Sequence, residues 1–318
     1  MTCARVTLLA LFVFLWTQPA HALLCGVTVS NLSFGNIDPL SGSPADNAAS
    51  ININCTGVPL TTIRFCLNIN SGTGGADGSG RYLSDGTGGT IRYQLYQDAA
   101  RTVVWGSTTW GFGGSPVQID VPLSLGGSGS AALTLYGRVF GGQSSVLSGS
   151  YTSNFNGLQL SFPYQLIALF DCNSILGFSP LFAVSSFTVS ANVPGDCLIT
   201  AQDINFGAQG HLNASVDAGG QLAITCTPGK NYTVALDNGQ NGSSPDARKM
   251  RKLLETITYG LYRDAARTQP WGNASGVDTI SGTGSGTQQL YDVYARVPAQ
   301  ATPSAGTYTD VVAVTVTY

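Results

Sequence analysis

The chain has 318 residues, of which 43% are hydrophobic and 10% are charged, and 40 of them are glycine. The apolar content is too high for a disordered protein, and the formal net charge of -3 provides no basic surface for nucleic acid. Short β-branched and aromatic segments between stretches rich in glycine, serine and asparagine predict an all-β protein, and the length suits two domains.

The first residues have the pattern of a secretion signal. Arg5 provides a positive charge, residues 6–16 form an apolar run, and residues 20–22 (Ala-His-Ala) match a cleavage site of small residues. The run is shorter than the roughly 20 residues that cross a bilayer. We therefore expect residues 1–22 to be removed, no membrane span to remain, and the mature chain to be exported to the periplasm and the cell surface.

One segment occurs twice in the chain. Tyr93–Gly106 reads YQLYQDAARTVVWG, and Tyr259–Gly272 reads YGLYRDAARTQPWG. The openings Cys25–Gly35 and Cys197–Gly207 also match, and each reads as a strand that ends in a Phe-Gly turn. Two copies on this scale indicate two related domains. Residues that both copies keep are expected to be scaffold, and residues that only one copy has are candidates for function.

The cysteines follow the repeat. Cys3 would leave with the signal peptide, and six cysteines remain. Cys25 and Cys55 stand almost as far apart in the first copy as Cys197 and Cys226 in the second. We therefore expect one disulfide within each copy, at its start.

Two cysteines are left over, and they have no counterparts in the second copy. Cys66 and Cys172 are expected to pair with each other, although the sequence alone does not settle this bridge. A metal site is not expected, because no cysteines have the C-x-x-C spacing and His211 is the only histidine of the mature chain. No cofactor is expected either.

Each copy later reaches a Gly-x-Tyr-Thr step that is followed by an alternating segment. In the first copy, Leu158, Leu160 and Phe162 point to one side. The corresponding residues of the second copy are Val312, Val314, Val316 and Tyr318. A period of two gives one buried and one wet face. About seven such strands in each copy predict two tandem immunoglobulin-like β-sandwiches.

The first copy has one more alternating strand. Residues 185–193 place four apolar side chains on one face, namely Phe187, Val189, Ala191 and Val193. The second copy ends at Tyr318, inside its last predicted strand, and is expected to lack this final strand. The predicted organisation is a first domain over residues 23–184, a linker strand over 185–194 and a second domain over 195–318.

These features together carry a resemblance to a known family. They are the Cys…Phe-Gly…Cys openings, the Leu-Tyr-x-Asp…Trp-Gly segments and the ending Tyr308–Tyr318. In this order, twice, behind a signal, they resemble tandem spore coat protein U domains, the domain type of the subunits of archaic chaperone–usher pili. The resemblance covers residues 25–318.

The resemblance implies donor-strand complementation, in which an incomplete sandwich is filled by a strand from a neighbouring subunit. It implies a periplasmic chaperone, an outer-membrane usher and a neighbouring pilin as partners. Residues 185–193 would then fill the first domain from within the chain, with Phe187, Val189, Ala191 and Val193 as the donor side chains. The second domain would need an external donor, and its acceptor strand would be formed by Val312, Val314, Val316 and Tyr318. A chain that accepts but does not donate is expected at the tip of the pilus, as an adhesin for surface attachment and biofilm formation.

Adhesive residues are expected in the first copy, where it differs from the second. Trp110 and Phe112 lie among glycines in a loop. A second apolar stretch, which a Cys66–Cys172 bridge would hold in place, contributes Leu166, Ile167, Phe170, Leu176 and Phe178. The alternative is that these residues are additional core. If they are exposed, the target would be a hydrophobic surface or a host receptor.

Catalytic chemistry is not indicated. His211 has no evident nucleophile near it in the sequence, so a Ser-His-Asp arrangement is not expected. The basic cluster at residues 248–252 is interpreted as the entry to a strand, with contact to an acidic chaperone or an anionic sugar as the alternative. Two other functions stay open: a structural spore-coat, cell-surface coat or pilus shaft protein without ligand binding, and a secreted hydrolase.

Overall fold

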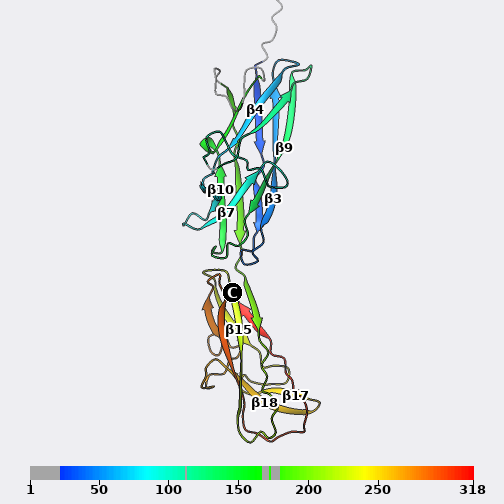
Figure 1. The fold of residues 1–318 in the computed structure, drawn as a ribbon, viewed down its shortest axis with the longest axis vertical. Helices are drawn as coiled ribbons and strands as arrows, with labels where there is room; N and C mark the ends of the chain where they lie inside the picture. Colours follow the sequence, from blue (N-terminus) through cyan, green and yellow to red (C-terminus); the bar gives the residue numbers. More distant parts are fainter. Residues whose placement is uncertain (1–21, 112, 167–171, 173–179) are drawn as a thin grey trace, which may run out of the picture.

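The computed structural model describes residues 22–318 apart from 112, 167–171 and 173–179. It consists of two β-sandwiches that lie end to end along one long axis (Figure 1). The predicted all-β fold with two tandem immunoglobulin-like domains is confirmed. Five of the predicted adhesive residues lie outside the described residues, namely Phe112, Ile167, Phe170, Leu176 and Phe178.

The first domain is built from the following elements: β1 (Leu24–Val29), β2 (Leu32–Asn36), β3 (Ala45–Thr56), β4 (Thr62–Ile69), β5 (Ala76–Asp77), β6 (Gly80–Ser84), β7 (Thr90–Tyr96), β8 (Val117–Pro122), β9 (Ser128–Val139), β10 (Gly149–Phe155), η1 (Gly157–Gln159), β11 (Leu160–Leu166), β12 (Leu181–Ala183) and β13 (Phe187–Val193). One sheet has the order β1-β3-β9-β7-β6-β10-β13-β2, with β5 beside β6. The other has the order β12-β11-β4-β8. A single residue pair, Thr152 with Ser84, joins β10 to β6.

The second domain repeats most of this plan. Its strands are β14 (Cys197–Ala201), β15 (Val216–Cys226), β16 (Asn231–Leu236), β17 (Arg248–Lys252), β18 (Glu255–Tyr262), β19 (Ile280–Thr283), β20 (Gln289–Val297) and β21 (Val314–Thr317). They form the sheets β14-β15-β20-β18-β17 and β19-β16-β21. These sheets correspond to β1-β3-β9-β7-β6 and β8-β4-β11 of the first domain. The neighbouring strands β10, β13 and β2 have no counterpart among residues 195–318, all of which the structure describes.

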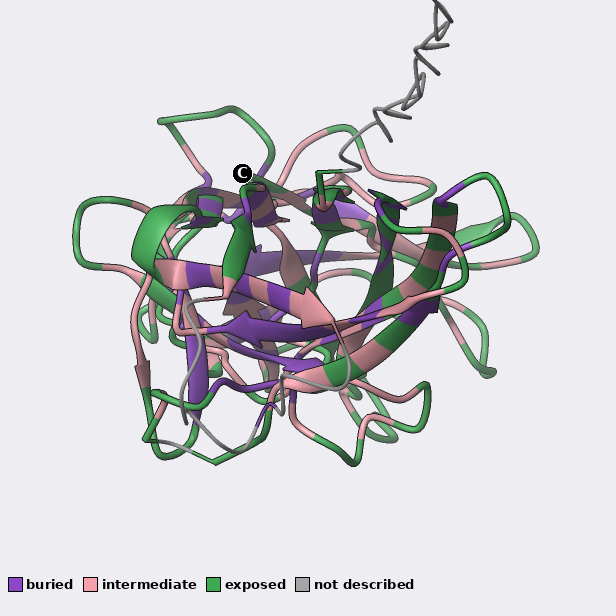
Figure 2. Ribbon diagram, turned by 90° about the horizontal axis from the view of Figure 1, so that it is seen from above, coloured by how far each residue is buried: buried purple, intermediate pink, exposed green. Residues whose placement is uncertain are grey.

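Each domain has a core of its own. Buried and exposed residues alternate along the strands, as β13 and β10 show with every second residue buried. Figure 2, which looks along the long axis, shows this alternation as bands of colour on the strands. The core of the first domain includes Trp105 and that of the second includes Trp271, and no residue belongs to both cores. Each sandwich therefore buries its apolar faces independently of the other.

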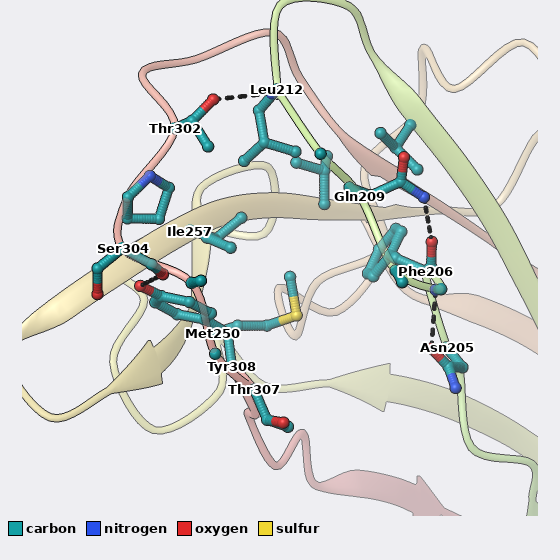
Figure 3. Close-up of a pocket in the computed structure, with 18 of the residues that line it drawn as sticks. Asn205, Phe206, Gln209, Leu212, Met250, Ile257, Thr302, Ser304, Thr307 and Tyr308 are labelled. Atoms are coloured by element: carbon teal, nitrogen blue, oxygen red, sulfur yellow. Dashed lines mark hydrogen bonds between the residues drawn. The ribbon is translucent and has the colours of Figure 1, made fainter.

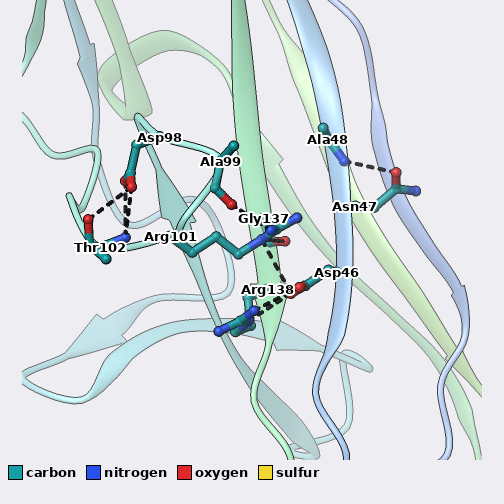
Figure 4. A network of polar contacts seen from close by, with 9 residues as sticks. All are labelled: Asp46, Asn47, Ala48, Asp98, Ala99, Arg101, Thr102, Gly137 and Arg138. Carbon is teal, nitrogen blue, oxygen red and sulfur yellow. Dashed lines mark hydrogen bonds and ion pairs between the residues drawn. The ribbon is translucent and has the colours of Figure 1, made fainter.

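A repeated polar network shows how closely the copies match. In the turn after β7, the carboxylate of Asp98 accepts hydrogen bonds from the backbone N–H group of Thr102 (Figure 4) and from that of Val103. Arg101 follows with a positive φ of 58° and lies 3.3 Å from Asp46, which Arg138 also binds at 2.7 Å. The second domain has the same arrangement of Asp264, Arg267, Asp217 and Arg296. The repeated Asp-Ala-Ala-Arg sequence is therefore a scaffold turn.

Two local predictions were wrong. The opening of the first domain is two strands, β1 and β2, and only the first of them has a counterpart in the second domain. Leu158 does not point into the core but is 91% exposed, because the short helix η1 interrupts the alternation before β11 begins. The sequence pattern missed the helix because the residues on either side keep a period of two.

The two domains meet through close backbone contact. Residues 194–196 connect β13 to β14. A Cβ atom built at Gly286 would lie 2.0 Å from the carbonyl oxygen of Ser144, and one at Gly229 would lie 3.2 Å from Leu147 Cδ2. Gly229 and Gly286 both have positive φ. The loops of the second domain that face the first therefore need glycine for its backbone conformation and for the close approach of the first domain.

Candidate functional site

The strand β13 completes the first domain. It runs antiparallel to β10 in a register that pairs Phe155 with Phe187, Ser153 with Val189 and Gly149 with Val193. On its other side it runs parallel to β2, where Val189 lies beside Leu32. Strand β13 therefore lies between β10 and β2, which are far apart in the sequence.

The inward face of β13 is fully covered. Val189 is 0% exposed, and Phe187, Ala191 and Val193 are also buried. Phe187 stacks on Phe155 with ring centroids 4.5 Å apart. Outward-facing polar groups support the position, because the Thr188 backbone N–H donates to Asn31 Oδ1 at 2.9 Å.

The second domain has matching positions, which its polar contacts identify. Trp105 Nε1 donates to the carbonyl oxygen of Leu67 at 2.9 Å, and Trp271 Nε1 donates to that of Val234 at 3.0 Å. Phe34 meets Tyr93 edge to face at 6.4 Å, and Phe206 meets Tyr259 at 6.1 Å. These pairs place Phe206 where the first domain has Phe34, in the segment that corresponds to β2.

A buried arginine fixes a further match. Arg81 Nη2 donates to the carbonyl oxygens of Ile69 and Trp105, and Arg248 Nη2 donates to those of Leu236 and Trp271. Both arginines are 0% exposed. Burial lowers the pKa of the Arg81 guanidinium to about 10, so it stays charged at neutral pH. Arg248 is therefore a core residue, and the strand-entry interpretation of the basic cluster at 248–252 describes its place in β17.

A groove runs through the second domain where the first domain holds β13. It consists of two adjoining hollows of about 630 and 370 Å³. The larger hollow is shown in Figure 3, where the Met250 side chain points into the space between Tyr308 and Phe206. The smaller hollow is lined by residues such as Tyr259, Val312 and Val314. Ile204, Phe206, Met250 and Tyr308 line both, so the hollows are continuous.

Burial shows what the groove lacks. In the first domain, the core residues beside β13 are all but inaccessible, at 0–1% exposure: Leu32, Leu83, Ile91, Tyr151 and Phe155. Their counterparts are only partly buried in the second domain: Ile204, Met250, Ile257, Tyr308 and Val312. The same positions are thus sealed in one copy and open in the other, because no strand covers them.

The backbone beside the groove also forms no regular strand pairing. The structure assigns no strand to residues 202–215 or 298–313, which correspond to the regions of β2 and β10. One isolated bridge, Arg251 with Thr309, holds the second segment at the place where Thr152 meets Ser84 in the first domain. Both walls of the groove therefore offer main-chain groups to a strand laid between them.

The predicted acceptor residues divide between two places. Val312 and Val314 line the groove. Val316 is half-buried against the core on β21, which pairs with β16. Tyr318 is 49% exposed, and its hydroxyl donates to Asp196 at the junction between the domains. The opposite wall of the groove, which includes Ile204, was not predicted, although the match of Ile204 with Leu32 in the two openings indicates it.

Two acidic side chains, Asp203 and Asp310, line the groove. Asp310 lines the smaller hollow, accepts a hydrogen bond from the Tyr259 hydroxyl at 2.7 Å on Oδ2 and accepts the Gln240 backbone N–H at 2.9 Å on Oδ1. Burial raises the pKa of the Tyr259 hydroxyl, and the hydrogen bond to Asp310 adds to the shift, so this hydroxyl remains a donor.

An apolar surface caps the far end of the first domain. Leu60 and Leu125 are 72% and 81% exposed, and Val58 is 51% exposed. Their loops touch, since the Leu60 backbone N–H donates to the carbonyl oxygen of Ser124 at 3.3 Å. The loops adjoin the starting end of β4, opposite the end where Ser144 meets the second domain. We call Val58, Leu60 and Leu125 the apolar pole. None of these three residues was predicted from the sequence to be adhesive.

The predicted loop tryptophan lies elsewhere. Trp110 is half-buried, and the Arg81 guanidinium stacks 3.9 Å from its ring centroid. Arg81 binds the carbonyl oxygen of Ile69 at the end of β4, while the apolar pole lies at the start of this strand of eight residues. At about 3.3 Å per residue, the two features are roughly 25 Å apart. Leu166 ends β11 and is half-buried beside Ile63.

The described residues form three disulfides. Cys25 bonds to Cys55 and Cys197 to Cys226, each joining the first strand of its domain to the next one in the sheet. Cys66 of β4 bonds to Cys172 at a sequence separation of 106. This third bridge exists only in the first domain.

Within the described part of the chain, no three His, Cys, Asp or Glu side chains gather as metal ligands would. None of the described residues forms a helix that is long and apolar enough to span a membrane.

Comparison with known proteins agrees with this architecture. The family model described as the Spore Coat Protein U domain matches residues 11–156 and 183–315. "Protein U" of Myxococcus xanthus is 30% identical over 165 residues, which are 46% of this chain and 92% of that protein.

Two solved structures resemble the whole chain. The chaperone–tip adhesion subunit pre-assembly complex CsuC–CsuE, from archaic chaperone–usher Csu pili of Acinetobacter baumannii, has a TM-score of 0.54 at 22% identity and covers 93% of this chain and 100% of that chain. The CupB6 tip adhesin of Pseudomonas aeruginosa has a TM-score of 0.41 at 13% identity and covers 92% and 93%. At these identities the first likeness shows the fold.

Proposed function

Because the chain belongs to the Spore Coat Protein U domain family, we propose that it is an exported pilus subunit whose second domain accepts a strand from a neighbouring subunit. One observation carries this proposal: the open groove of the second domain coincides with the place that β13 fills in the first. The chain thus contains a filled and an unfilled version of the same sandwich.

The energetics favour an external strand. Burying Phe187, Val189 and Val193, with a smaller contribution from Ala191, stabilises the first domain by about 5–8 kcal/mol before the cost of ordering the strand. The stability of a whole domain is about 5–15 kcal/mol. A sandwich without this strand is therefore marginal, and its two unpaired edges invite aggregation. A periplasmic chaperone that occupies the groove before an outer-membrane usher exchanges it for a pilin strand would remove both problems.

We also propose that the subunit sits at the tip. Its own donor-type strand, β13, is already used by the first domain, so the described residues offer one open groove and no free donor strand. The first domain also indicates where the neighbour would lie, because β13 leaves its groove beside Gly149. The counterpart of Gly149 is Gly306, where a Cβ atom would touch Lys252 at the end of β17. Figure 1 shows β17 toward the end of the second domain away from the first, so the neighbour would extend the same long axis.

The apolar pole is the proposed adhesive surface. It lies at the opposite end of the molecule from the proposed neighbour, and it exposes Val58, Leu60 and Leu125 together. Clustered apolar side chains on a soluble domain mark a contact surface. We propose that it attaches the pilus to hydrophobic surfaces and so supports biofilm formation, with Trp110 acting through the first domain's stability.

The strand-acceptor function of the groove is tested by peptide binding. The mature chain is heated with and without a synthetic peptide of residues 185–194, the segment that fills the first domain. Because the two cores are separate, we expect two unfolding transitions, and the peptide should raise that of the second domain by about 10 °C at a hundredfold excess over Kd. A peptide with aspartate at the Phe187 and Val189 positions is the matched control.

A variant distinguishes groove binding from adsorption. Val312→Asp places a charge in the groove and should abolish the shift, whereas Val277→Asp, at a residue 72% exposed outside it, should not. If saturating peptide leaves the second transition unchanged in the unaltered chain, the acceptor function is excluded. A self-contained coat protein without a ligand would then be the better description.

Adhesion has its own test. Leu60→Ser and Leu125→Ser should each reduce retention on an alkyl-coated surface by about tenfold, the equivalent of one leucine burial. Leu158→Ser is the matched control, since Leu158 is 91% exposed on η1, away from the pole. Equal retention of all three variants would remove the apolar pole from the adhesive surface.

A further inference from the structure

We propose that Asp310 selects the strand that enters the second-domain groove, favouring a serine or threonine at the position where β13 carries Val189. This inference rests on the proposed strand-acceptor function and names the chemistry of the partner strand.

The register of the two copies locates the contact. In the first domain, Thr152 pairs with Ser84, and the next residue, Ser153, lies opposite Val189. In the second domain, Thr309 forms the same bridge to Arg251, so Asp310 occupies the place of Ser153. Directly opposite residues of antiparallel strands have their Cβ atoms about 4.5–5.5 Å apart. The residue that replaces Val189 in an entering strand would therefore face Asp310.

The two copies differ chemically at this point. Ser153 is 0% exposed, and its hydroxyl can both donate and accept. Asp310 can only accept when ionised, and the structure shows one hydrogen bond to each of its oxygens, from Tyr259 and Gln240. A carboxylate has about four acceptor positions, so capacity remains for a donor from an entering strand.

Insertion of a strand would remove water from Asp310. An apolar residue opposite it would leave the remaining acceptor positions without partners, which costs free energy. A short hydroxyl side chain supplies the missing donor within the cross-strand distance. A lysine is less suitable, because the buried Arg248 guanidinium already provides a positive charge beneath this part of the groove.

A second substitution between the copies acts in the same direction. The counterpart of Asn31, whose Oδ1 accepts the Thr188 backbone N–H in the first domain, is Asp203, and Asp203 lines the same hollow as Asp310. An ionised Asp203 accepts only. The entering strand therefore needs a free backbone N–H one residue before the hydroxyl, which excludes proline there, and an acidic strand is disfavoured throughout.

The test uses fluorescent peptides of residues 185–194 and the mature full-length chain. The unaltered peptide is compared with its Val189→Thr, Val189→Lys and Val189→Glu forms by anisotropy titration. We expect the threonine peptide to bind about tenfold more tightly than the valine peptide, as for one hydrogen bond to a charged acceptor, and the glutamate peptide to bind most weakly.

Variants of the protein assign the effect to Asp310. In Asp310→Ser, which copies the first domain, the preference for threonine should disappear; Asp310→Asn, of the same shape, serves where the serine variant does not fold. Equal binding of valine and threonine peptides, or tightest binding of the lysine peptide, would overturn the selection by Asp310 and leave the acceptor function standing. If no peptide binds, the acceptor function fails and this inference fails with it.

Discussion

Phe187 lies face to face with Phe155, with ring centroids 4.5 Å apart and an interplanar angle of 4°. Phe155 belongs to β10 and Phe187 to β13, and they are directly paired in the sheet. In the second domain, the counterpart of Phe155 is the half-buried Val312, which borders the groove. The first domain thus contains both partners of this contact, whereas the second domain contains only the residue that corresponds to Phe155.

Removing the stacking contact between Phe155 and Phe187 should destabilise the first domain. We expect Phe187→Ala to lower the free energy of unfolding of the first domain by about 3–5 kcal/mol, because a fully buried ring leaves a cavity. Chemical denaturation of the chain, read from the first-domain transition, measures the change. Ser190→Ala, on the outward face of the same strand, is the control and should change stability by less than about 0.5 kcal/mol. Equal effects of both variants would contradict the packing role of Phe187.

The third disulfide should matter to one domain only. Replacing Cys66 and Cys172 together by alanine should lower the stability of the first domain by about 2–5 kcal/mol, because the bridge closes a long loop of the unfolded chain. Differential scanning calorimetry should show a lower first-domain transition and an unchanged second-domain transition. A shift of both transitions would mean that the domains do not unfold independently.

Replacing the buried Arg248 should destabilise the second domain. Arg248→Met should destabilise the second domain by more than about 3 kcal/mol, because the carbonyl oxygens of Leu236 and Trp271 would lose their shared donor in the core. Arg248→Lys should recover little, since an ammonium group cannot reproduce the planar fork. Lys249→Met, on the neighbouring position of β17, is the control. Denaturant midpoints of the second domain measure all three variants.

The repeated ion pairs should make stability depend on acid. The hydrogen bond from Arg138 holds the pKa of Asp46 below its ordinary value, and Arg296 does the same for Asp217. Each carboxylate therefore adds stability that is fully present above about pH 4, the unfolded pKa, and is lost as the pH falls through the lower native pKa. These sites are partly exposed, so each contribution should stay below about 1 kcal/mol.

The comparison of unfolding at pH 7 and pH 3 tests this dependence. Asp46→Asn should remove part of the acid sensitivity from the first domain alone, and Asp217→Asn should remove it from the second alone. A variant that loses stability equally at both pH values would show that the carboxylate acts through its shape and not through its charge.

The duplication, the all-β class and the strand alternation could be predicted from the sequence, because they depend on local spacing: the Asp98 and Asp264 turns and the period of two in β13 can be read along the chain. Comparison of the copies also indicated that one sandwich has a strand that the other lacks. The sequence did not separate Leu158 from the core residues beside it, because a short helix preserves the apparent alternation.

Which side chains share a surface could be seen only in the folded molecule. The groove collects Ile204, Met250 and Val312 from segments more than forty residues apart, and the apolar pole joins Leu60 to Leu125 through loops that are distant in the chain. The sequence marks Trp110 as unique to the first copy, and the structure adds that its ring lies on the Arg81 guanidinium. Burial and long-range pairing depend on how strands of distant sequence pack together, and a pattern of neighbouring residues carries no record of that packing.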